Sequence, residues 1–267
     1  MIFEIFQIDA FTNTLFGGNP AAVCLLKEWL PDTTLLHIAQ ENNLAETAYV
    51  VHEKDNIFKL RWFTPEIEID LCGHATLATA FVIFNFLNFD NDIILFETMS
   101  GDLEVKVDHE FIEMRFPSRP PEKVALPQTI ANALSKQPKE VYKARDYILM
   151  YPCEKDIQQL KVDASILANI DLNLGGICVT SKGNNTDFVS RFFTPGAAIF
   201  EDPVTGSAHC SLVPLWAKYL KKDTFHALQI SKRQGELFCE LADDVVLIKG
   251  EAVKYLANLA GMQPYMF

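Results

Sequence analysis

Positively charged side chains are scarce in this sequence. Its 267 residues include 23 Lys and Arg against 35 Asp and Glu, which gives a formal net charge of −12 at pH 7. No stretch combines clustered Lys and Arg with aromatic side chains, and a strongly negative protein repels a phosphate backbone. We therefore do not expect a nucleic acid as a partner.

A long apolar segment and a basic N-terminal region are also lacking. Met1-Ile2-Phe3-Glu4, followed by Asp9, differs from the basic start and apolar core of a secretory signal peptide. The longest apolar stretches are too short to span a membrane as a helix. With 49% hydrophobic and 22% charged residues, the composition is typical of a globular protein with one large or two ordinary domains. These features predict a cytoplasmic protein without a membrane partner.

The six cysteines are scattered, and no two of them form a Cys-x-x-Cys pair. Reduced thiols are therefore expected rather than a disulfide framework or a zinc site. His209 and Cys210 are adjacent potential ligands, but no further His or Cys follows at ligand spacing, so we expect no metal. Gly17-Gly18-Asn19-Pro20 lacks the Lys-Ser/Thr end of a phosphate-binding loop and predicts a tight turn that shapes the wall of a site.

What the sequence does contain is an internal repeat. The segment from Leu44 to Pro65 recurs, with loose identity, from Leu174 to Pro195. The two copies share the Leu at the start with an Asn directly before it, a Phe and an Arg at matching positions, and the run Phe-Thr-Pro at the end. Further on, Gly73 and Ala75 correspond to Gly206 and Ala208 after a small shift in spacing. Two related halves in one chain predict a duplicated fold, with a binding site where the halves meet.

Local patterns predict the same order of elements in each half. β-Branched and aromatic content predicts strands, and periodicity predicts short helices. In the first half we expect strands over 2–10, 21–26, 48–52 and 58–63 and a helix over 33–42. In the second half we expect strands over 147–151, 176–180 and 188–193 and a helical piece over 165–170. Each half then ends in a hairpin, over 103–116 with a turn at 108–110, and over 237–248.

The Pro-rich, polar passage 117–121 is the natural linker between the two halves. We therefore expect an N-terminal domain over 1–116 and a C-terminal domain over 122–267, with the alternative that the last strand returns to the N-terminal domain. The sequence after Leu256 carries no motif that indicates its course.

A helix is expected after each Phe-Thr-Pro run. Residues from Gly73 to Leu87 are almost all apolar or small, which predicts a helix enclosed by protein on every side. The helix from Ser207 to Leu220 has apolar residues at the spacing of one packed face. Both helices begin with a glycine and then a small or polar residue, and their unpaired N–H groups favour a carboxylate. As an alternative, the glycines only shape the turns before buried helices.

The most informative position is one where the copies disagree. Glu46 has Gly176 as its counterpart, so one half carries a carboxylate that the other half lacks. Residues around Glu46 are apolar, and burial there would favour a carboxyl group that both takes and returns a proton. A solvated glutamate at the start of a strand is the alternative.

Six short segments together resemble one protein family. They are Asp9-Ala10-Phe11, Phe16-Gly17-Gly18-Asn19-Pro20-Ala21-Ala22-Val23, Ala45-Glu46-Thr47-Ala48, Phe63-Thr64-Pro65, Asp70-Leu71-Cys72-Gly73-His74-Ala75-Thr76 and Glu201-Asp202-Pro203-Val204-Thr205-Gly206-Ser207-Ala208. Their order and spacing are similar to those of the phenazine-biosynthesis PhzF-like family. The resemblance implies the diaminopimelate epimerase-like α+β fold, with two pseudo-symmetric domains that each curl a mostly antiparallel sheet around a central helix. It also implies a homodimer.

The same resemblance implies a cofactor-free isomerase and a role for each matching residue. Glu46 would move a proton between carbons of a small carboxylate-bearing substrate, which we expect to be cyclic and amino-substituted, in the cleft between the domains. Gly73, His74, Gly206 and Ser207 would surround the carboxylate of the substrate, Asp202 would lie beside its amino group, and Asn19 would line the site. Glu46, His74 and Asp202 are thus the expected catalytic residues.

Other interpretations remain open at this stage. His74 could be a capping or core histidine instead of orienting Asp202 or the ligand, and Asp202 and Ser207 could cap a helix. A cysteine-based racemase would use Cys72, but the second cysteine that such a mechanism needs is absent, which leaves Cys72 as a packing residue. A non-catalytic ligand-binding protein that kept the fold is a third possibility.

Overall fold

The chain forms two compact units. The computed structural model describes residues 2–173 and 175–261, so Leu174 of the repeat and the end of the chain after Gly261 lie outside the described residues. One unit comprises Met1–Arg115 and Lys249–Phe267, and the other comprises Phe116–Ile248. The boundary between the units therefore falls inside the strand Phe111–Pro117, just before the passage 117–121 that we expected to be a linker. The last strand belongs to the first unit.

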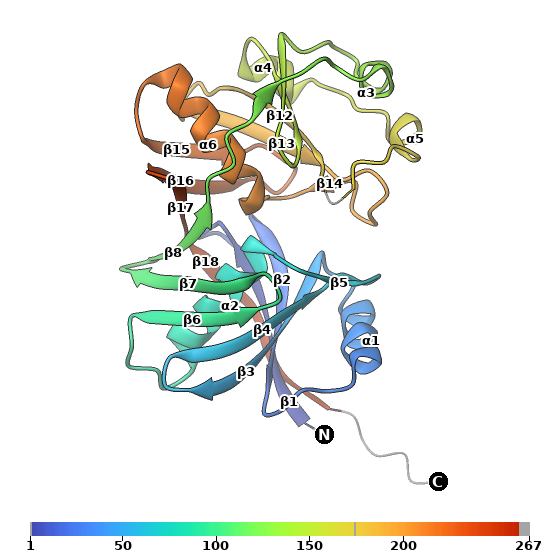
Figure 1. Cartoon of the computed structure of the whole chain (residues 1–267). Helices are drawn as coiled ribbons and strands as arrows, with labels where there is room; N and C mark the ends of the chain where they lie inside the picture. The colour runs from blue at the N-terminus through green and yellow to red at the C-terminus, as the bar shows by residue number, and fades with distance from the viewer. Residues whose placement is uncertain (1, 174, 262–267) are drawn as a thin grey trace. The chain divides into compact units, whose positions relative to one another are not determined.

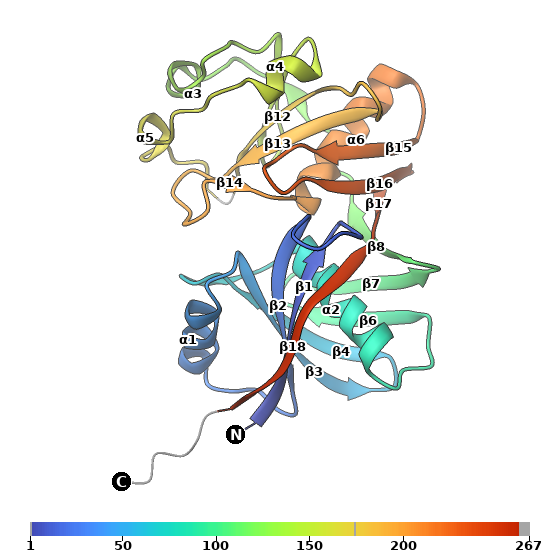
Figure 2. The same ribbon diagram turned by 180° about the vertical axis from the view of Figure 1, so that it is seen from behind.

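The first unit is one sheet wrapped around one helix. Its elements are β1 (Ile2–Ala10), β2 (Asn19–Leu26), α1 (Asp32–Asn42), β3 (Glu46–Lys54), β4 (Ile57–Phe63), β5 (Glu68–Ile69), α2 (Gly73–Phe86), β6 (Ile93–Thr98), β7 (Gly101–Asp108), β8 (Phe111–Pro117) and β18 (Ala252–Gly261). Hydrogen bonding connects β18, β1, β2, β3, β4, β6, β7 and β8 in that order, and only the β2–β3 and β4–β6 pairs are parallel. Figure 2 shows β18 alongside β1, with which it pairs antiparallel.

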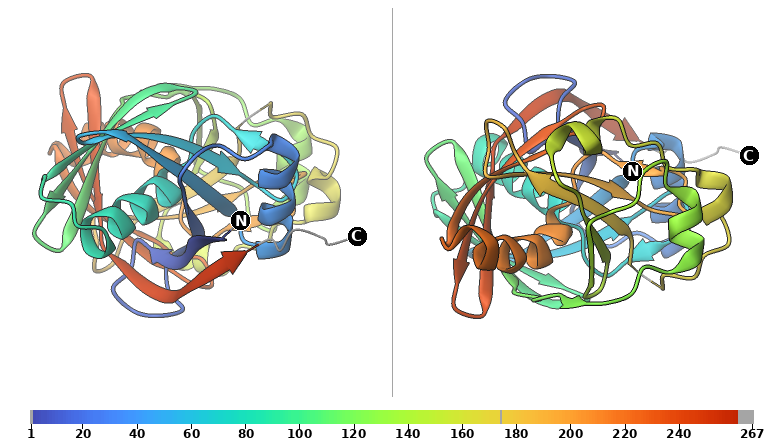
Figure 3. Two further views of the ribbon diagram at one scale, coloured as in Figure 1. Left: turned by 90° about the horizontal axis from the view of Figure 1, so that it is seen from below. Right: turned by 90° about the horizontal axis from the view of Figure 1, so that it is seen from above.

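The helix α2 is the core of the first unit because nearly every side chain on it is small or apolar. Every residue from Gly73 to Ala80 is buried, as are Val82 and Ile83. The helix contacts β1, β2, β3, β7 and β18, so strands enclose it, as Figure 1 and the view from below in Figure 3 show. The expectation of a helix surrounded by protein is confirmed.

The second unit repeats this plan. Its elements are β9 (Glu122–Lys123), α3 (Gln128–Ala133), β10 (Glu140–Lys143), β11 (Tyr147–Met150), α4 (Glu154–Gln158), α5 (Ala164–Leu167), β12 (Ile177–Lys182), β13 (Phe188–Phe193), β14 (Glu201–Asp202), α6 (Gly206–Leu220), β15 (Thr224–Gln229), β16 (Gly235–Ala242) and β17 (Val245–Gly250). The parallel and antiparallel pairs of β11, β12, β13, β15 and β16 match those of β2, β3, β4, β6 and β7. The duplication and the fold class expected from the sequence are confirmed.

The two copies differ in the helices other than the central one. The expected helix over 33–42 is present as α1, whereas the helical piece expected over 165–170 is limited to the four residues of α5. The strand expected to start at Gly176 begins one residue later. No helix within the described ranges is both long and apolar enough to cross a membrane.

The repeated arginine explains part of the shared sequence. Arg61 donates through Nε and Nη2 to the two carboxylate oxygens of Glu68, at 2.7 and 2.6 Å. Arg191 donates in the same way to Glu201, at 2.7 and 2.8 Å. In each unit this bidentate pair holds the short strand that leads into the central helix. The Arg–Glu pair that the two copies share is therefore a structural contact close to the start of α2 or α6.

Substitution of Arg191 is expected to lower the stability of the protein. Its Nη1 also donates to the carbonyl oxygens of Ile157 and Leu160, both at 2.9 Å, and 15% of its side chain is exposed. Lys cannot form this fork, so Arg191→Lys should reduce the free energy of unfolding by about 2 kcal/mol. Urea denaturation measures the difference. Lys123→Arg, at an exposed ion pair, is the control and should change the free energy by less than about 0.5 kcal/mol.

Candidate active site

Glu46 is the first residue of β3 in the first unit. Its side chain is 17% exposed, and its backbone pairs with Ala21 in the neighbouring parallel strand β2. The matching position in the second unit has no room for a side chain. A Cβ on Gly176 would lie 2.4 Å from the ring of Phe192 and 2.8 Å from the carbonyl oxygen of Phe193. The Glu46/Gly176 mismatch therefore has a packing cause in the second unit.

This packing can be tested directly. Gly176→Ala should lower the free energy of unfolding by about 2 kcal/mol, because the buried ring of Phe192 must move to admit a methyl group. Thermal or urea unfolding of the variant checks the value. The loss should shrink in a Phe192→Leu background, where the side chain is smaller. An equal loss in both backgrounds would show that Phe192 is not the obstacle.

His74, the second residue of α2, contacts Glu46. Only 4% of His74 is exposed, and its Nε2 lies 3.0 Å from Oε2 of Glu46. The two groups form an ion pair when the ring is protonated, and neither atom has another partner among the described residues. On the other side of the ring, the amide nitrogen of Asn19 lies 3.1 Å from Nδ1. The expected residues Glu46, His74, Gly73 and Asn19 thus gather in the first unit.

The charge of His74 depends on its neighbours. Burial opposes a charge on the ring, but the negative charges that Cys72 and Glu46 can carry outweigh it and raise the pKa of His74 well above 6.5. The pKa of the Cys72 thiol is itself raised, by burial first and then by Glu46. Cys72 and then Glu46 are thus the neighbours that favour a proton on the His74 ring.

Asn19 is placed to respond to that charge. It is the first residue of β2 and is fully buried. A neutral ring with its proton on Nε2 accepts from the amide nitrogen of Asn19, whereas a cationic ring donates from Nδ1 and needs the amide oxygen. A half-turn of the amide group supplies either partner. Asn19 therefore contacts His74, in addition to its expected place at the wall of the site.

Cys72 is the residue whose position the sequence analysis did not foresee. It immediately precedes α2, and its Sγ lies 3.5 Å from Nδ1 of His74. One donor atom from each of Glu46, Cys72 and His74 lies within 4.8 Å of the other two. The spacing Cys-Gly-His at a helix start was the signal that could have shown this contact. His209, which the sequence analysis weighed as a ligand beside Cys210, instead directs Nδ1 to the carbonyl oxygen of Thr205 at 3.0 Å.

The other expected site residues lie in the second unit. Asp202 accepts a hydrogen bond of 2.5 Å from the hydroxyl of Thr205, the residue that precedes α6. Gln229 joins the same turn, because it accepts from the backbone N–H of Thr205 and donates to the carbonyl oxygen of Asp202. Asp202 therefore helps to shape the turn before α6, where Gly206 is the first helical residue.

An arginine lies beside the start of α6. Arg145 donates from Nη2 to the hydroxyl oxygen of Ser207 at 2.9 Å and pairs with Asp146 at 3.3 Å. Asp146 is buried and accepts from the backbone N–H of Gly176 at 2.8 Å. The guanidinium adds positive charge to the end of the helix where a carboxylate was expected. No motif in the sequence had indicated Arg145.

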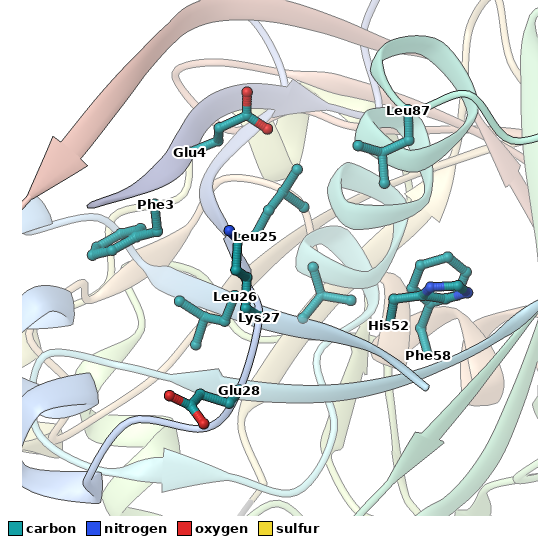
Figure 4. A pocket seen from close by; sticks show the side chains of 10 residues that line it. Phe3, Glu4, Leu25, Leu26, Lys27, Glu28, His52, Phe58 and Leu87 are labelled. Atoms are coloured by element: carbon teal, nitrogen blue, oxygen red, sulfur yellow. The ribbon is translucent and has the colours of Figure 1, made fainter. Parts of the chain in front are cut away.

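The first unit also has an apolar pocket, which lies away from Glu46 and His74. Its volume is about 420 Å³, and Figure 4 shows Phe3, Leu26, Phe58 and Leu87 among the side chains that line it. It is formed by the C-terminal end of β2 and residues late in β3, whereas Asn19 and Glu46 begin these strands. None of the expected site residues lines this pocket.

Comparisons with known proteins agree with this fold. The two sheets, each curled around one helix, form the diaminopimelate epimerase-like fold. The sequence matches the family described as phenazine biosynthesis-like protein (PhzC-PhzF) over residues 8–257, and the chain belongs to this family.

Several relatives cover almost the whole chain. An uncharacterized isomerase of Pseudomonas aeruginosa is 45% identical over 97% of this chain and 98% of its own. Another, of Halalkalibacterium halodurans, is 43% identical over 97% of this chain and 98% of its own. The structure of a PhzF family protein from Enterococcus faecalis has a TM-score of 0.94 at 42% identity, over 98% and 100% of the two chains. The expected family and the isomerase class are confirmed.

Proposed function

We propose that this chain is a cofactor-independent isomerase in which Glu46 moves a proton between two carbons of a small substrate. The observation that carries the proposal is the buried contact between Glu46 Oε2 and His74 Nε2, at a position where the other half of the repeat has only glycine. Membership of a family whose relatives are named isomerases supports the reaction class. We propose that the substrate carries a carboxylate and is cyclic and amino-substituted.

The contact suits proton transfer in both directions. Beside a cationic His74, the ionised form of the Glu46 side chain can take a proton from a substrate carbon. Once Glu46 is protonated, the positive charge of His74 remains next to the negative charge that develops on the substrate. Glu46 can then return the proton to the second carbon. A positioned acid/base of this kind contributes a factor of about 10²–10⁴ in rate.

Helix N-termini are the groups that we propose for recognition of the substrate. We propose that the N-terminus of α2 at Gly73 and that of α6 at Gly206 and Ser207 bind the carboxylate, as helix N-termini favour anions. Arg145, which already holds Ser207, adds positive charge beside that helix. Asp202 would accept a hydrogen bond from the amino group.

A cysteine-based racemase is the less favoured alternative. Thr205 stands before α6 as Cys72 stands before α2, and its hydroxyl is engaged with Asp202. A hydroxyl in that place cannot act as the second thiol base.

Hydrogen exchange during turnover tests the proposal. The protein, treated with a chelator and without added cofactor, is incubated in deuterated water with cyclic amino-substituted carboxylic acids. We expect deuterium to enter a carbon position of at least one acid, followed by NMR. The corresponding amides serve as matched substrates and should react far more slowly, because they lack the charge that the helix N-termini bind. Equal exchange into acid and amide would contradict the carboxylate assignment.

Assembly and location belong to the same proposal. We propose a homodimer in the cytoplasm, where the six free thiols would remain reduced. Analytical ultracentrifugation of the purified protein tests the dimer, and a monomer at micromolar concentration would contradict it.

A further inference from the structure

The apolar pocket of the first unit lies where the central helix ends. Helix α2 extends to Phe86, and Leu87, which directly follows it, lines the pocket. Leu25 of β2 and Val50 of β3 are paired in register and line it as well, and Glu4 of β1 is paired with Leu25. Beyond its last residue the helix no longer covers the sheet, so a cavity of about 420 Å³ remains against these strands (Figure 4).

A second cavity, of about 460 Å³, adjoins the first, because His52, Phe58 and Leu87 line both. The rings of His52 and Phe58, which are paired between β3 and β4, have centroids 4.7 Å apart. Phe89, in the wall of the second cavity, packs against Phe58 with ring centroids 5.6 Å apart. We call the two cavities together the α2-end groove. Each has the volume of a small-molecule site, about 300–1,000 Å³, and the side chains that they share are apolar or aromatic.

The charged side chains at the α2-end groove are mostly acidic. Glu4 and Glu28 line the first cavity, and Asp55 and Asp90 line the second. Among the described residues that line either cavity, Lys27 is the one Lys or Arg. All five are exposed, and neither Glu4 nor Glu28 forms an ion pair within the part of the chain that the structure describes. An apolar cavity edged mainly by one sign of charge attracts ligands of the opposite sign.

We propose that the α2-end groove binds an organic cation with an apolar body, such as an arylalkyl amine. The apolar body would lie against Leu25, Val50 and Phe58. The ammonium group would lie at the rim, beside the carboxylate of Glu4 or Glu28. Burial of the apolar body provides most of the binding free energy, and the carboxylates and aromatic rings favour a cation over a neutral or anionic ligand of the same shape.

This groove is separate from the proposed active site. His52 follows Glu46 by six residues in β3, which is about 20 Å along an extended strand. All the residues that line the groove belong to the first unit. The binding of a cation there does not rest on the proposed function, and its test needs no substrate.

Three naphthalene derivatives that differ mainly in charge test the class of ligand. They are 1-naphthylmethylamine, which is a cation at pH 7, 1-naphthylmethanol, which is neutral, and 1-naphthoate, which is an anion. Isothermal titration calorimetry measures the Kd of each for the wild-type protein. We expect the amine to bind about tenfold more tightly than the alcohol, and the anion to bind most weakly. Equal affinities, a preference for the anion, or no binding of the amine would overturn the proposal.

Variants of the acidic side chains test the place of the ammonium group. Glu4→Gln and Glu28→Gln should each weaken binding of the amine about threefold, and the double variant should bind amine and alcohol equally. Lys27→Gln should strengthen binding of the amine. The matched control is Glu110→Gln, which changes an exposed acid in the turn between β7 and β8 and should leave the Kd unchanged. Wild-type affinity for the amine in the double variant would overturn the assignment.

Binding at the active site is distinguished by a second measurement, because the proposed substrate also carries an amino group. In NMR spectra, the amine should shift the ring signals of His52, assigned with His52→Gln, and leave those of His74 in place. Leu87→Trp, which places a larger side chain in the groove, should abolish binding of both amine and alcohol, with circular dichroism as the check on folding. Loss of amine binding in Glu46→Gln, or a shift of the His74 signals alone, would place the amine at the active site and overturn the proposal.

Discussion

Glu46→Gln is expected to reduce kcat by about 10³-fold while the substrate still binds. The substitution keeps the size of the side chain and one acceptor oxygen, replaces the other oxygen by an amide NH2 group, and removes the ability to carry a proton between two carbons. General acid/base catalysis by one group contributes about 10²–10⁴-fold, and Glu46 would serve in both steps of the reaction. The measurement is the rate of deuterium incorporation in deuterated water, with kcat and KM determined separately.

Two controls separate this chemical effect from a loss of structure. Glu68→Gln changes a carboxylate of the same unit that is engaged by Arg61, and it should leave kcat within about twofold, although stability should fall. Glu46→Asp retains the acid but withdraws it by one methylene, so it should keep a measurable part of the rate. Equal deuterium uptake by the wild-type protein and Glu46→Gln would exclude Glu46 as the proton carrier.

The fold could be predicted from the sequence because the same local patterns occur in both halves of the repeat. The Phe-Thr-Pro runs, the enclosed helix from Gly73 and the alternating hairpins each have a local signature, and these elements are present within a few residues of the expected bounds. Boundaries were less accurate where long-range pairing decides them. Pro117, which reads as part of a linker, is the last residue of β8.

The candidate site was only partly visible in the sequence. Glu46 and His74 could be selected because one is a mismatch in the repeat and the other follows a helix-starting glycine. Their contact depends on β3 beginning beside the start of α2, and no local pattern records that distance. Cys72 was taken as a packing residue for the same reason, although its thiol lies against the His74 ring. Arg145 has no counterpart in the first half and could not be inferred from the repeat.

The Glu46/Gly176 mismatch also had to be reinterpreted. On the sequence alone, divergence in both size and charge favours a functional difference. The structure adds that Phe192 and the backbone of Phe193 occupy the space that a side chain at position 176 would need. The glycine is thus explained by packing, and only the glutamate requires a chemical explanation.

His74→Gln is expected to lower both the stability and the rate. It removes the positive charge next to Glu46, whose Oε2 is buried, and an unpaired buried carboxylate costs about 3 kcal/mol. The double variant Glu46→Gln/His74→Gln should recover most of this loss, because it removes the uncompensated charge as well. Urea denaturation of the four proteins gives the coupling free energy. Additive effects of the two substitutions would show that the contact contributes no stability.

The raised pKa of His74 also predicts how the difference in the free energy of unfolding between the wild-type protein and His74→Gln depends on pH. A histidine whose folded pKa lies above its ordinary value of 6.5 contributes stability that is fully present below 6.5 and is lost as the pH rises through the folded pKa. The free-energy difference between the wild-type protein and His74→Gln should therefore be larger at pH 6 than at a pH above the folded value. Denaturation curves over this range measure it, and NMR titration of the His74 ring locates the folded pKa. A difference that grows with pH would mean that the buried ring is neutral in the folded protein, and that Cys72 and Glu46 do not keep it charged.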